Sequence, residues 1–489
     1  MNIHLRQVGG NALSILSSDV LNRATSFVLY ALVARHLGAL EFGQLSLALT
    51  LFYVFQVFAV SGVKVLTVRQ VAKDRSQTGK YFVNGCLIVS ATSLVSLAVL
   101  FGFLRFVHYA ASTNLVILLL SLALLPYAIS AICEAIFQAW ERMKYIAYVN
   151  VPANIAKMVG AYLLLSWNRG LRTVILVLLA TFFTVASVEV CLVLRRFPGP
   201  WASVDIPFSL ATLRSAATFL GIDGAVAIES SLNVVFLSKF ATVKEVGLYS
   251  SAAQLLVPLL LVYSSIAQSI FPLMCRKVAP GYQALRRIAE QATQGLLVLA
   301  VPMVAGIFFL GEGALTLLYK NRAFLEAVPA LRIMAWTLIL QVFSFVLGQV
   351  LLATHRERIT FRITVVDLLV NLSVGPFLIW HFGLIGAALT LLLTRFSACI
   401  QHLVPVIRLL SGLSLGKIIW KPVLAAVCMV AYLAFAVPQE HLLHTAASAT
   451  LIYAAALLAV AVLACGGIRE FKNRYFALDR TSEATISES

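Results

Sequence analysis

The dominant pattern along the chain is a succession of long apolar runs separated by short polar segments. A helix needs about 20 apolar residues to cross about 30 Å of hydrocarbon. Fourteen runs approach or reach that length, near residues 8–34, 42–63, 81–104, 114–138, 145–167, 173–194, 209–237, 246–274, 289–310, 328–353, 360–380, 383–407, 419–437 and 445–466. The pattern predicts an all-α polytopic membrane protein with about fourteen transmembrane helices.

Composition excludes the other broad classes of protein. Of the 489 residues 61% are hydrophobic and only 12% are charged, whereas an ordinary soluble domain is about one quarter charged. The seven cysteines are scattered singly, so neither disulfides nor a metal site is expected. No connecting segment is long enough for a catalytic domain, and the phosphate-binding and zinc-protease motifs GxxxxGK[ST] and HExxH are missing from the sequence. We therefore expect a function inside the bundle and no enzyme activity.

The basic excess of the chain, 37 Lys+Arg against 20 Asp+Glu, follows the connections between the apolar runs. Lys and Arg accumulate on the cytoplasmic side of membrane proteins. With both termini in the cytoplasm, 25 basic residues fall in cytoplasmic segments, 9 on the opposite side and 3 within helices. The charge is thus a topology signal, and nucleic-acid binding is not indicated.

The sequence also repeats itself. Residues 35–48, RHLGALEFGQLSLA, align without a gap on residues 239–252, KFATVKEVGLYSSA, at an offset of 204 residues. Short matches of this kind also arise by chance in apolar sequence. The aligned pairs include Arg35 with Lys239, Glu41 with Glu245, Gly43 with Gly247, and, upstream, Asp19 with Asp223.

Six spans separate the repeated stretches, and an even number returns the chain to the same side of the membrane. This predicts two parallel six-helix lobes, at residues 1–200 and 201–411, with two appended helices at 412–468 and a cytoplasmic tail at 469–489. Parallel repeats of this kind place a binding cavity between the lobes near the midplane and predict alternating access.

Polar residues within the apolar runs indicate where a cavity would lie, because a charge at the bilayer centre costs at least about 2.5 to 3.5 kcal/mol. They recur at helical spacing in five runs. The sets are Asn11, Ser14, Ser18, Asn22 and Thr25 with Asp19, Arg23 and Ser26 beside them; Asn150, Asn154 and Lys157; Asp223, Ser230 and Asn233 with Glu229 further round; Thr364, Asp367 and Asn371; and Thr394 with Arg395.

Each charge also has a structural interpretation. Asp19 and Arg23 are spaced i,i+4 and could neutralise each other. Lys157 and Arg395 could extend to the membrane interface. Glu134 and Glu189 lie nearer the ends of their runs, where we expect interfacial positions.

Two stretches carry a resemblance to a known family. ALVARHLGALEFGQLSLALTL, followed by VLTVRQVAKDRSQTGKYF, resembles the N-terminal region of bacterial polysaccharide flippases, the Wzx-type O-antigen exporters. Their superfamily also holds multidrug-and-toxin extruders and lipid II flippases. The repeated GLYSSAAQLL and the fourteen runs extend the resemblance over essentially the whole chain.

The resemblance implies that an oligosaccharide linked through pyrophosphate to undecaprenol is turned from the cytoplasmic to the periplasmic leaflet of the inner membrane, for O-antigen, capsule or exopolysaccharide synthesis. Lipid-linked oligosaccharide and membrane lipids are the expected partners, with polysaccharide polymerase machinery beside them. No cofactor is expected beyond a coupling proton or sodium ion. The candidates are Arg23, Lys157 and Arg395 for the pyrophosphate, and Asp19, Asp223, Glu229 and Asp367 for the cavity or the coupling ion.

Two other functions stay open. Four acids accompany three bases within the spans, which keeps a cation-coupled multidrug antiporter on the same fold as the alternative. A membrane polysaccharide polymerase or ligase would need a sizeable periplasmic loop with catalytic Arg or His, and no such loop is visible in the sequence.

Overall fold

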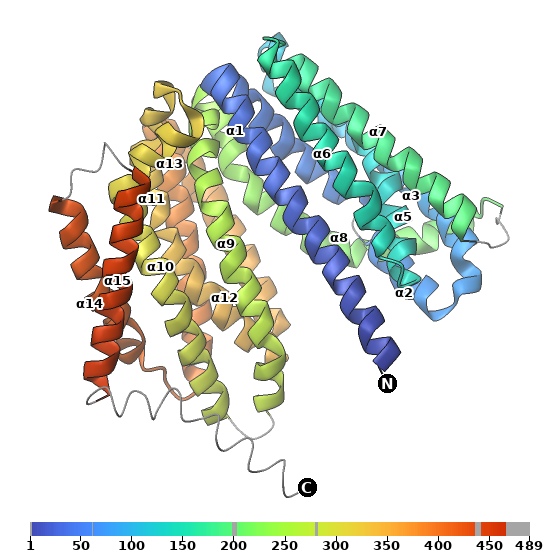
Figure 1. The fold of residues 1–489 in the computed structure, drawn as a ribbon. Helices are drawn as coiled ribbons and strands as arrows, with labels where there is room; N and C mark the ends of the chain where they lie inside the picture. The colour runs from blue at the N-terminus through green and yellow to red at the C-terminus, as the bar shows by residue number, and fades with distance from the viewer. Residues whose placement is uncertain (1, 61, 198–202, 279–281, 436–441, 466–489) are drawn as a thin grey trace, which may run out of the picture. The chain divides into compact units, whose positions relative to one another are not determined.

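The structure, a computed structural model, describes residues 2–60, 62–197, 203–278, 282–435 and 442–465, with side chains from residue 21 onward except 218 and 222. Within these ranges the chain is helical throughout and contains no strand (Figure 1). The predicted tail at 469–489 lies outside the described residues. The helices are α1 Asn2–Val60, α2 Val63–Lys73, η1 Arg75–Gln77, α3 Thr78–Val107, α4 Ala111–Ser121, α5 Leu124–Ala139, α6 Lys144–Ser166, α7 Leu171–Arg196, α8 Ile206–Phe240, α9 Val243–Val278, α10 Tyr282–Tyr319, η2 Arg322–Ala327, α11 Val328–Ala335, α12 Thr337–Ala353, α13 Glu357–Leu409, α14 Leu415–Phe435 and α15 Leu442–Ala464.

The helices confirm the predicted polytopic membrane fold. Among the described residues, 11 helical segments are long and apolar enough to cross a membrane. Two of them, in α1 and α13, contain a glycine with positive φ, Gly38 at 80° and Gly383 at 51°, where the backbone leaves the helix. Only glycine adopts such angles readily, so each long helix divides there into two spans. With α6, whose polar stripe lowers its hydropathy, the described chain matches the fourteen predicted runs.

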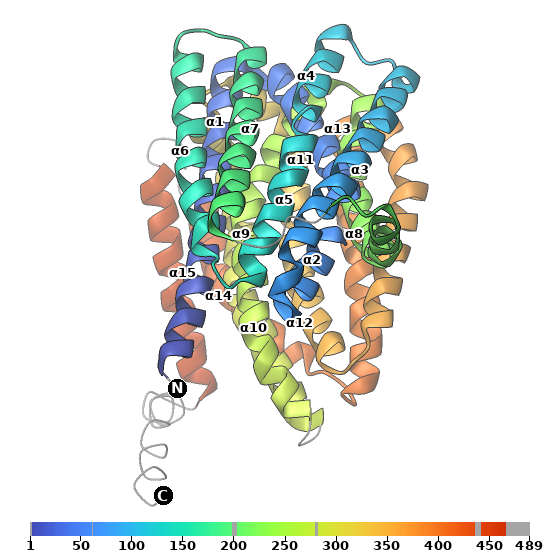
Figure 2. The same cartoon turned by 90° about the vertical axis from the view of Figure 1, so that its right-hand side faces the viewer.

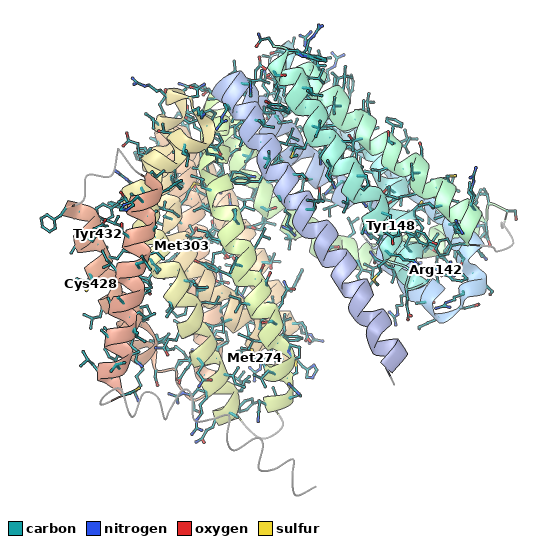
Figure 3. All side chains as sticks on the ribbon, in the orientation of Figure 1. Arg142, Tyr148, Met274, Met303, Cys428 and Tyr432 are labelled. Atoms are coloured by element: carbon teal, nitrogen blue, oxygen red, sulfur yellow. The ribbon has the colours of Figure 1, made fainter. Side chains whose placement is uncertain are left out.

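The outward surface is that of a protein solvated by lipid. Large apolar side chains stand exposed along the helices, among them Phe106, Trp380 and Leu463, which are 83%, 68% and 78% exposed. Figure 3 shows side chains projecting along the length of the helices, including Tyr148 on α6 and Cys428 on α14. Surface patches of this extent are rare on soluble monomers.

The described chain forms two compact units. The first comprises Met1–Ser251, Leu318–Phe324 and Thr364–Thr390, and the second comprises Ala252–Leu317, Leu325–Ile363 and Leu391–Ser489. In the first, α1 packs against α3, α4, α5, α6 and α8, and Figures 1 and 2 both show α6 beside α1. In the second, α14 and α15 form a hairpin in which the hydroxyls of Tyr432 and Ser448 lie 2.7 Å apart. The division into lobes at residues 200 and 411 stays a prediction.

The two repeated stretches cross each other inside the first unit. A Cβ added to Gly43 of α1 would lie 1.9 Å from the carbonyl oxygen of Val243 in α9. A Cβ added to Gly247 would lie 2.0 Å from the carbonyl oxygen of Ala39. Gly43 aligns with Gly247 and Ala39 with Val243 at the repeat offset of 204 residues, so the two contacts are reciprocal. Only glycine lets two helix backbones approach this closely.

The aligned cations make equivalent contacts beside this crossing. The Arg35 guanidinium donates to the carbonyl oxygen of Leu318 at 3.2 Å, and the Lys239 ammonium donates to that of Val107 at 3.0 Å. Leu318 and Val107 lie at the C-terminal ends of α10 and α3, where carbonyl groups lack helical partners and cations are stabilised. Both cations therefore tie helix ends together at the same end of the first unit.

The aligned glutamates also match. Glu41 accepts a hydrogen bond from the backbone N–H of Leu171, the first residue of α7, at 3.3 Å. Glu245 accepts one from the N–H of Leu384, directly after the kink in α13, at 2.7 Å. A carboxylate at a helix start satisfies a free N–H and interacts favourably with the helix dipole. Three aligned pairs thus make equivalent contacts, which supports the predicted internal repeat.

Candidate functional site

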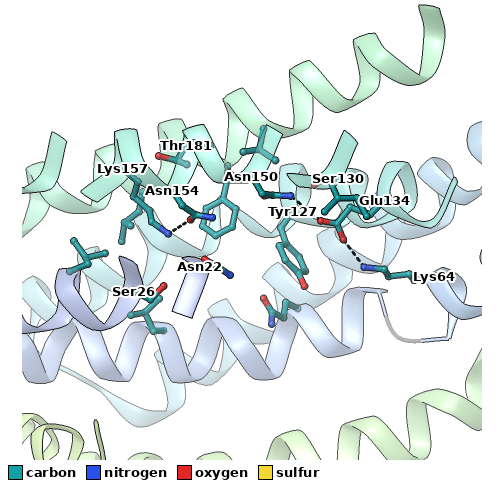
Figure 4. Close-up of a pocket in the computed structure, with 18 of the residues that line it drawn as sticks. Asn22, Ser26, Lys64, Tyr127, Ser130, Glu134, Asn150, Asn154, Lys157 and Thr181 are labelled. Atoms are coloured by element: carbon teal, nitrogen blue, oxygen red, sulfur yellow. Dashed lines mark hydrogen bonds and ion pairs between the residues drawn. The ribbon is translucent and has the colours of Figure 1, made fainter. Parts of the chain in front are cut away.

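A polar cavity of about 580 Å³ lies within the first unit, between α1, α5, α6 and α7, with Lys64 of α2 at its edge (Figure 4). Its volume is within the range of small-molecule sites. Hydroxyl, amide and charged groups make up much of its wall. The polar lining consists of Asn22, Ser26, Tyr30, Gln56, Lys64, Tyr127, Ser130, Glu134, Gln138, Asn150, Asn154, Lys157 and Thr181.

One end of the cavity is built by α6. Asn150, Asn154 and Lys157 are spaced four and three residues apart, which places them on one helical face. All three line the cavity, and Asn22 and Ser26 of α1 line it as well. The Lys157 ammonium donates to the Asn154 side-chain oxygen at 2.6 Å. Among the side chains that the structure describes, this neutral amide is the only polar partner of Lys157, so its charge is available to an anion.

The other end of the cavity holds an ion pair. The Lys64 ammonium lies 2.7 Å from Glu134 Oε2, and Asn150 donates to Glu134 Oε1 at 3.3 Å. Both charged side chains are partly exposed, at 31% and 22%, because they face the cavity. The pair is electrically balanced. The wall described here therefore carries one excess positive charge, that of Lys157.

Sequence reasoning missed this pair for two reasons. Lys64 directly follows the apolar run 42–63 and belongs in sequence to a predicted cytoplasmic connection, but Gly62, with φ of 81°, precedes α2 there, and α2 packs against α5. Glu134 lies near the end of its apolar run, where we expect an interfacial position, and in the structure it lines the cavity. An acid within a span requires a partner, and this signal could have identified it.

The other predicted site residues whose side chains the structure describes lie on different helices, outside the cavity wall. Arg23 is exposed on α1 and is not part of the cavity wall, and the side chain of Asp19 lies outside the described residues. Asp223 is exposed on α8. Arg395 is half-buried on the part of α13 that belongs to the second unit.

Two predicted acids are buried in the first unit. Glu229 on α8 and Asp367 on α13 are 9% and 6% exposed, and both have polar partners. On α8 the buried polar face consists of Glu229 and Asn233, whereas Asp223 and Ser230 are exposed. The face predicted from Asp223, Ser230 and Asn233 is therefore divided by packing.

Glu189 of α7 is a further acid that the sequence placed at the interface. It is fully buried, and the Ser130 hydroxyl on α5 donates to its Oε2. Its Oε1 is buried without a hydrogen-bond partner. Within the described residues no cluster of metal-ligating side chains occurs, and all seven cysteines are free thiols.

Comparison with known proteins identifies the family. Residues 8–277, more than half of the chain, match the family described as polysaccharide biosynthesis protein. A probable low-salt glycan biosynthesis flippase of Haloferax volcanii is 22% identical over 394 residues, which cover 80% of this chain and 82% of that protein. The capsular polysaccharide biosynthesis protein CapF of Staphylococcus aureus is 22% identical over 398 residues, covering 79% and 96%.

Solved structures show the same fold at lower identity. The lipid II flippase MurJ, in an inward closed conformation, has a TM-score of 0.73 at 16% identity, covering 93% of this chain and 98% of that one. An inward-facing multidrug transporter of the MATE family has a TM-score of 0.62 at 13% identity, covering 80% and 94%. Fold and family match agree, and the chain belongs to the polysaccharide biosynthesis protein family.

Proposed function

We propose that this protein is a flippase that moves a lipid-linked oligosaccharide across the inner membrane for surface polysaccharide synthesis, with both termini in the cytoplasm. Family membership and the printed names of the relatives, a glycan biosynthesis flippase and a capsular polysaccharide protein, support this class. The observation that carries the proposal is the polar cavity with Lys157 at one end.

The proposed substrate carries a pyrophosphate between the sugar and undecaprenol. A pyrophosphate in hydrocarbon needs cationic partners. Among the side chains that the structure describes, no carboxylate pairs with Lys157 of the cavity wall, and we propose that Lys157 binds this group. Amide and hydroxyl groups such as Asn22, Asn150 and Thr181 then face the sugar hydroxyls. We assign Arg23 and Arg395 to the same anion at other points of its path.

Alternating access is the proposed mechanism. The crossing of Gly43 and Gly247, with Arg35 and Lys239 beside it, holds one end of the first unit closed. A change of access requires these contacts to separate. We propose that a proton or sodium ion drives the change through Asp19, Asp223, Glu229 and Asp367, and that polymerase machinery receives the product.

The multidrug alternative is disfavoured by charge. A site for organic cations is expected to be acidic and aromatic, whereas the described residues of this cavity wall include two lysines and one glutamate.

Substitution of Lys157 tests the proposal in cells. Lys157→Ala should reduce surface polysaccharide at least about tenfold, because a charge-assisted contact contributes about 1.5 to 3 kcal/mol. Lys157→Arg should retain much of the export. Lys144→Ala, on the same helix and exposed, is the matched control and should export normally. Normal export by Lys157→Ala at equal abundance would contradict the role of the cavity.

A further inference from the structure

Glu189 is the most deeply buried acid of the first unit that the proposed function does not use. Its side chain is 0% exposed, and its Oε1 has no hydrogen-bond partner in the structure. An ionised carboxylate in such a place costs several kcal/mol, because burial removes that oxygen from bulk solvent and no described donor contacts it. The protonated form is neutral and avoids this cost.

The surroundings connect this carboxyl group to the cavity. Glu189 lies four residues after Val185, which lines the cavity, so both share a face of α7. Its hydrogen-bond partner Ser130 also lines the cavity, one turn before Glu134 on α5. A serine hydroxyl both donates and accepts, so it can pass a proton between Glu189 and cavity water.

The charges near Glu189 favour its protonated, neutral form. Glu134 and Lys64 neutralise each other at 2.7 Å, so an ionised Glu189 would be an unbalanced negative charge. The helices packed against α7 are α1, α4, α5 and α6. The titratable or charged groups they and α2 bring to this region are Tyr30, Tyr127, Cys133, Glu134, Lys157 and Lys64, while Glu41 of α1 binds the far end of α7.

We propose that Glu189, with Ser130, is an exchangeable proton-binding site of the cavity, whose proton affinity is set by the Glu134–Lys64 pair. The proton moves between Glu189 and cavity water, and no other bond is made or broken. As a coupling site it rests on the proposed transport function, because an anion bound beside Lys157 would strengthen proton binding electrostatically, and the proton would strengthen anion binding equally.

Infrared titration of the full chain in lipid nanodiscs tests the site without any glycolipid. The carbonyl stretch of a protonated carboxyl group is absent from a carboxylate. The wild-type chain should lose one such buried band as pH rises, and Glu189→Gln should lack it. Glu290→Gln, whose carboxylate accepts hydrogen bonds from Arg286 and Ser414, is the control and should keep it. An unchanged band in Glu189→Gln, or a wild-type band that does not respond to pH, would overturn the proposal.

Two neighbouring variants give a second signature. Glu134→Gln removes a negative charge and should shift the midpoint of the titration to lower pH by about one unit or more. Lys64→Gln removes the positive charge and should shift it to higher pH. If Glu189→Gln does not accumulate, these two opposite shifts of the titration midpoint test the proposal by themselves. Shifts in the same direction, or no shift in either variant, would overturn the assignment. The titration and glycolipid transport are measured separately, so either proposal can fail alone.

Discussion

Substitution of Gly43 by alanine should force the crossing of α1 and α9 apart. The added Cβ would lie 1.9 Å from the Val243 carbonyl oxygen, whereas real Cβ atoms essentially never come within 3.0 Å of such a neighbour. The backbones must therefore separate by at least about 1 Å, and overpacking of this kind costs about 1 to 3 kcal/mol. The higher helix propensity of alanine offsets up to about 1 kcal/mol of this cost.

The cost applies only to the state in which the helices cross, so it shifts the balance between access states. A difference of about 1 to 3 kcal/mol changes their ratio about 5- to 150-fold. Gly102→Ala is the matched control, because an added Cβ on this exposed helical glycine meets no atom within 4 Å. It should leave the ratio unchanged and the helix slightly more stable.

Thiol labelling measures this shift. A cysteine at Val243, in a chain without the seven native cysteines, reports the crossing because Val243 is partly buried there. An impermeant reagent should label it several-fold faster in the Gly43→Ala chain than in the Gly102→Ala chain. Gly247→Ala should act in the same direction, since its Cβ would meet Ala39 at 2.0 Å. Equal labelling in all three chains would refute the argument.

Three further predictions concern topology, the first helix and pH. A reporter fused after Lys73 should report the cytoplasm and one at Lys320 the periplasm, as enzyme reporters on each side would show. If Asp19 and Arg23 form only an ion pair, exchanging them should restore export lost in either single variant; full loss at normal abundance would indicate separate roles. The pKa of Asp205 lies below its ordinary value, chiefly because its carboxylate accepts the backbone N–H three residues later. The stabilisation that the Asp205 carboxylate provides is therefore present above the ordinary pKa of 3.8 and is lost as pH falls through the lowered pKa. In the Asp205→Asn chain the melting temperature should change less with pH over that acid range.

The helices were predictable from sequence because they depend on local pattern. Runs of about 20 apolar residues fix the spans, and the spacing of Asn150, Asn154 and Lys157 places them on one face. The repeat paired Gly43 with Gly247, although it could not show that the two touch.

The ion pair and the buried acid were not predictable in the same way. Lys64, Glu134 and Glu189 come from three helices, and only tertiary packing brings Lys64 and Glu134 to one cavity and Glu189 to Ser130 of its wall. A loop lysine and a lysine starting a buried helix look alike in sequence. On α8 the spacing of polar residues is compatible with more than one polar face, and packing against neighbouring helices buries the face that carries Glu229.

Flipping in reconstituted vesicles tests the central claim most directly. Vesicles containing the purified chain receive an undecaprenyl-pyrophosphate-linked oligosaccharide in one leaflet, and a membrane-impermeant glycosidase measures its arrival in the other. We predict that the wild-type chain transfers the glycolipid, that Lys144→Ala does so equally, and that Lys157→Ala is slower by at least about tenfold. Transfer by Lys157→Ala at the wild-type rate, or no transfer by the wild-type chain above protein-free vesicles, would contradict the account.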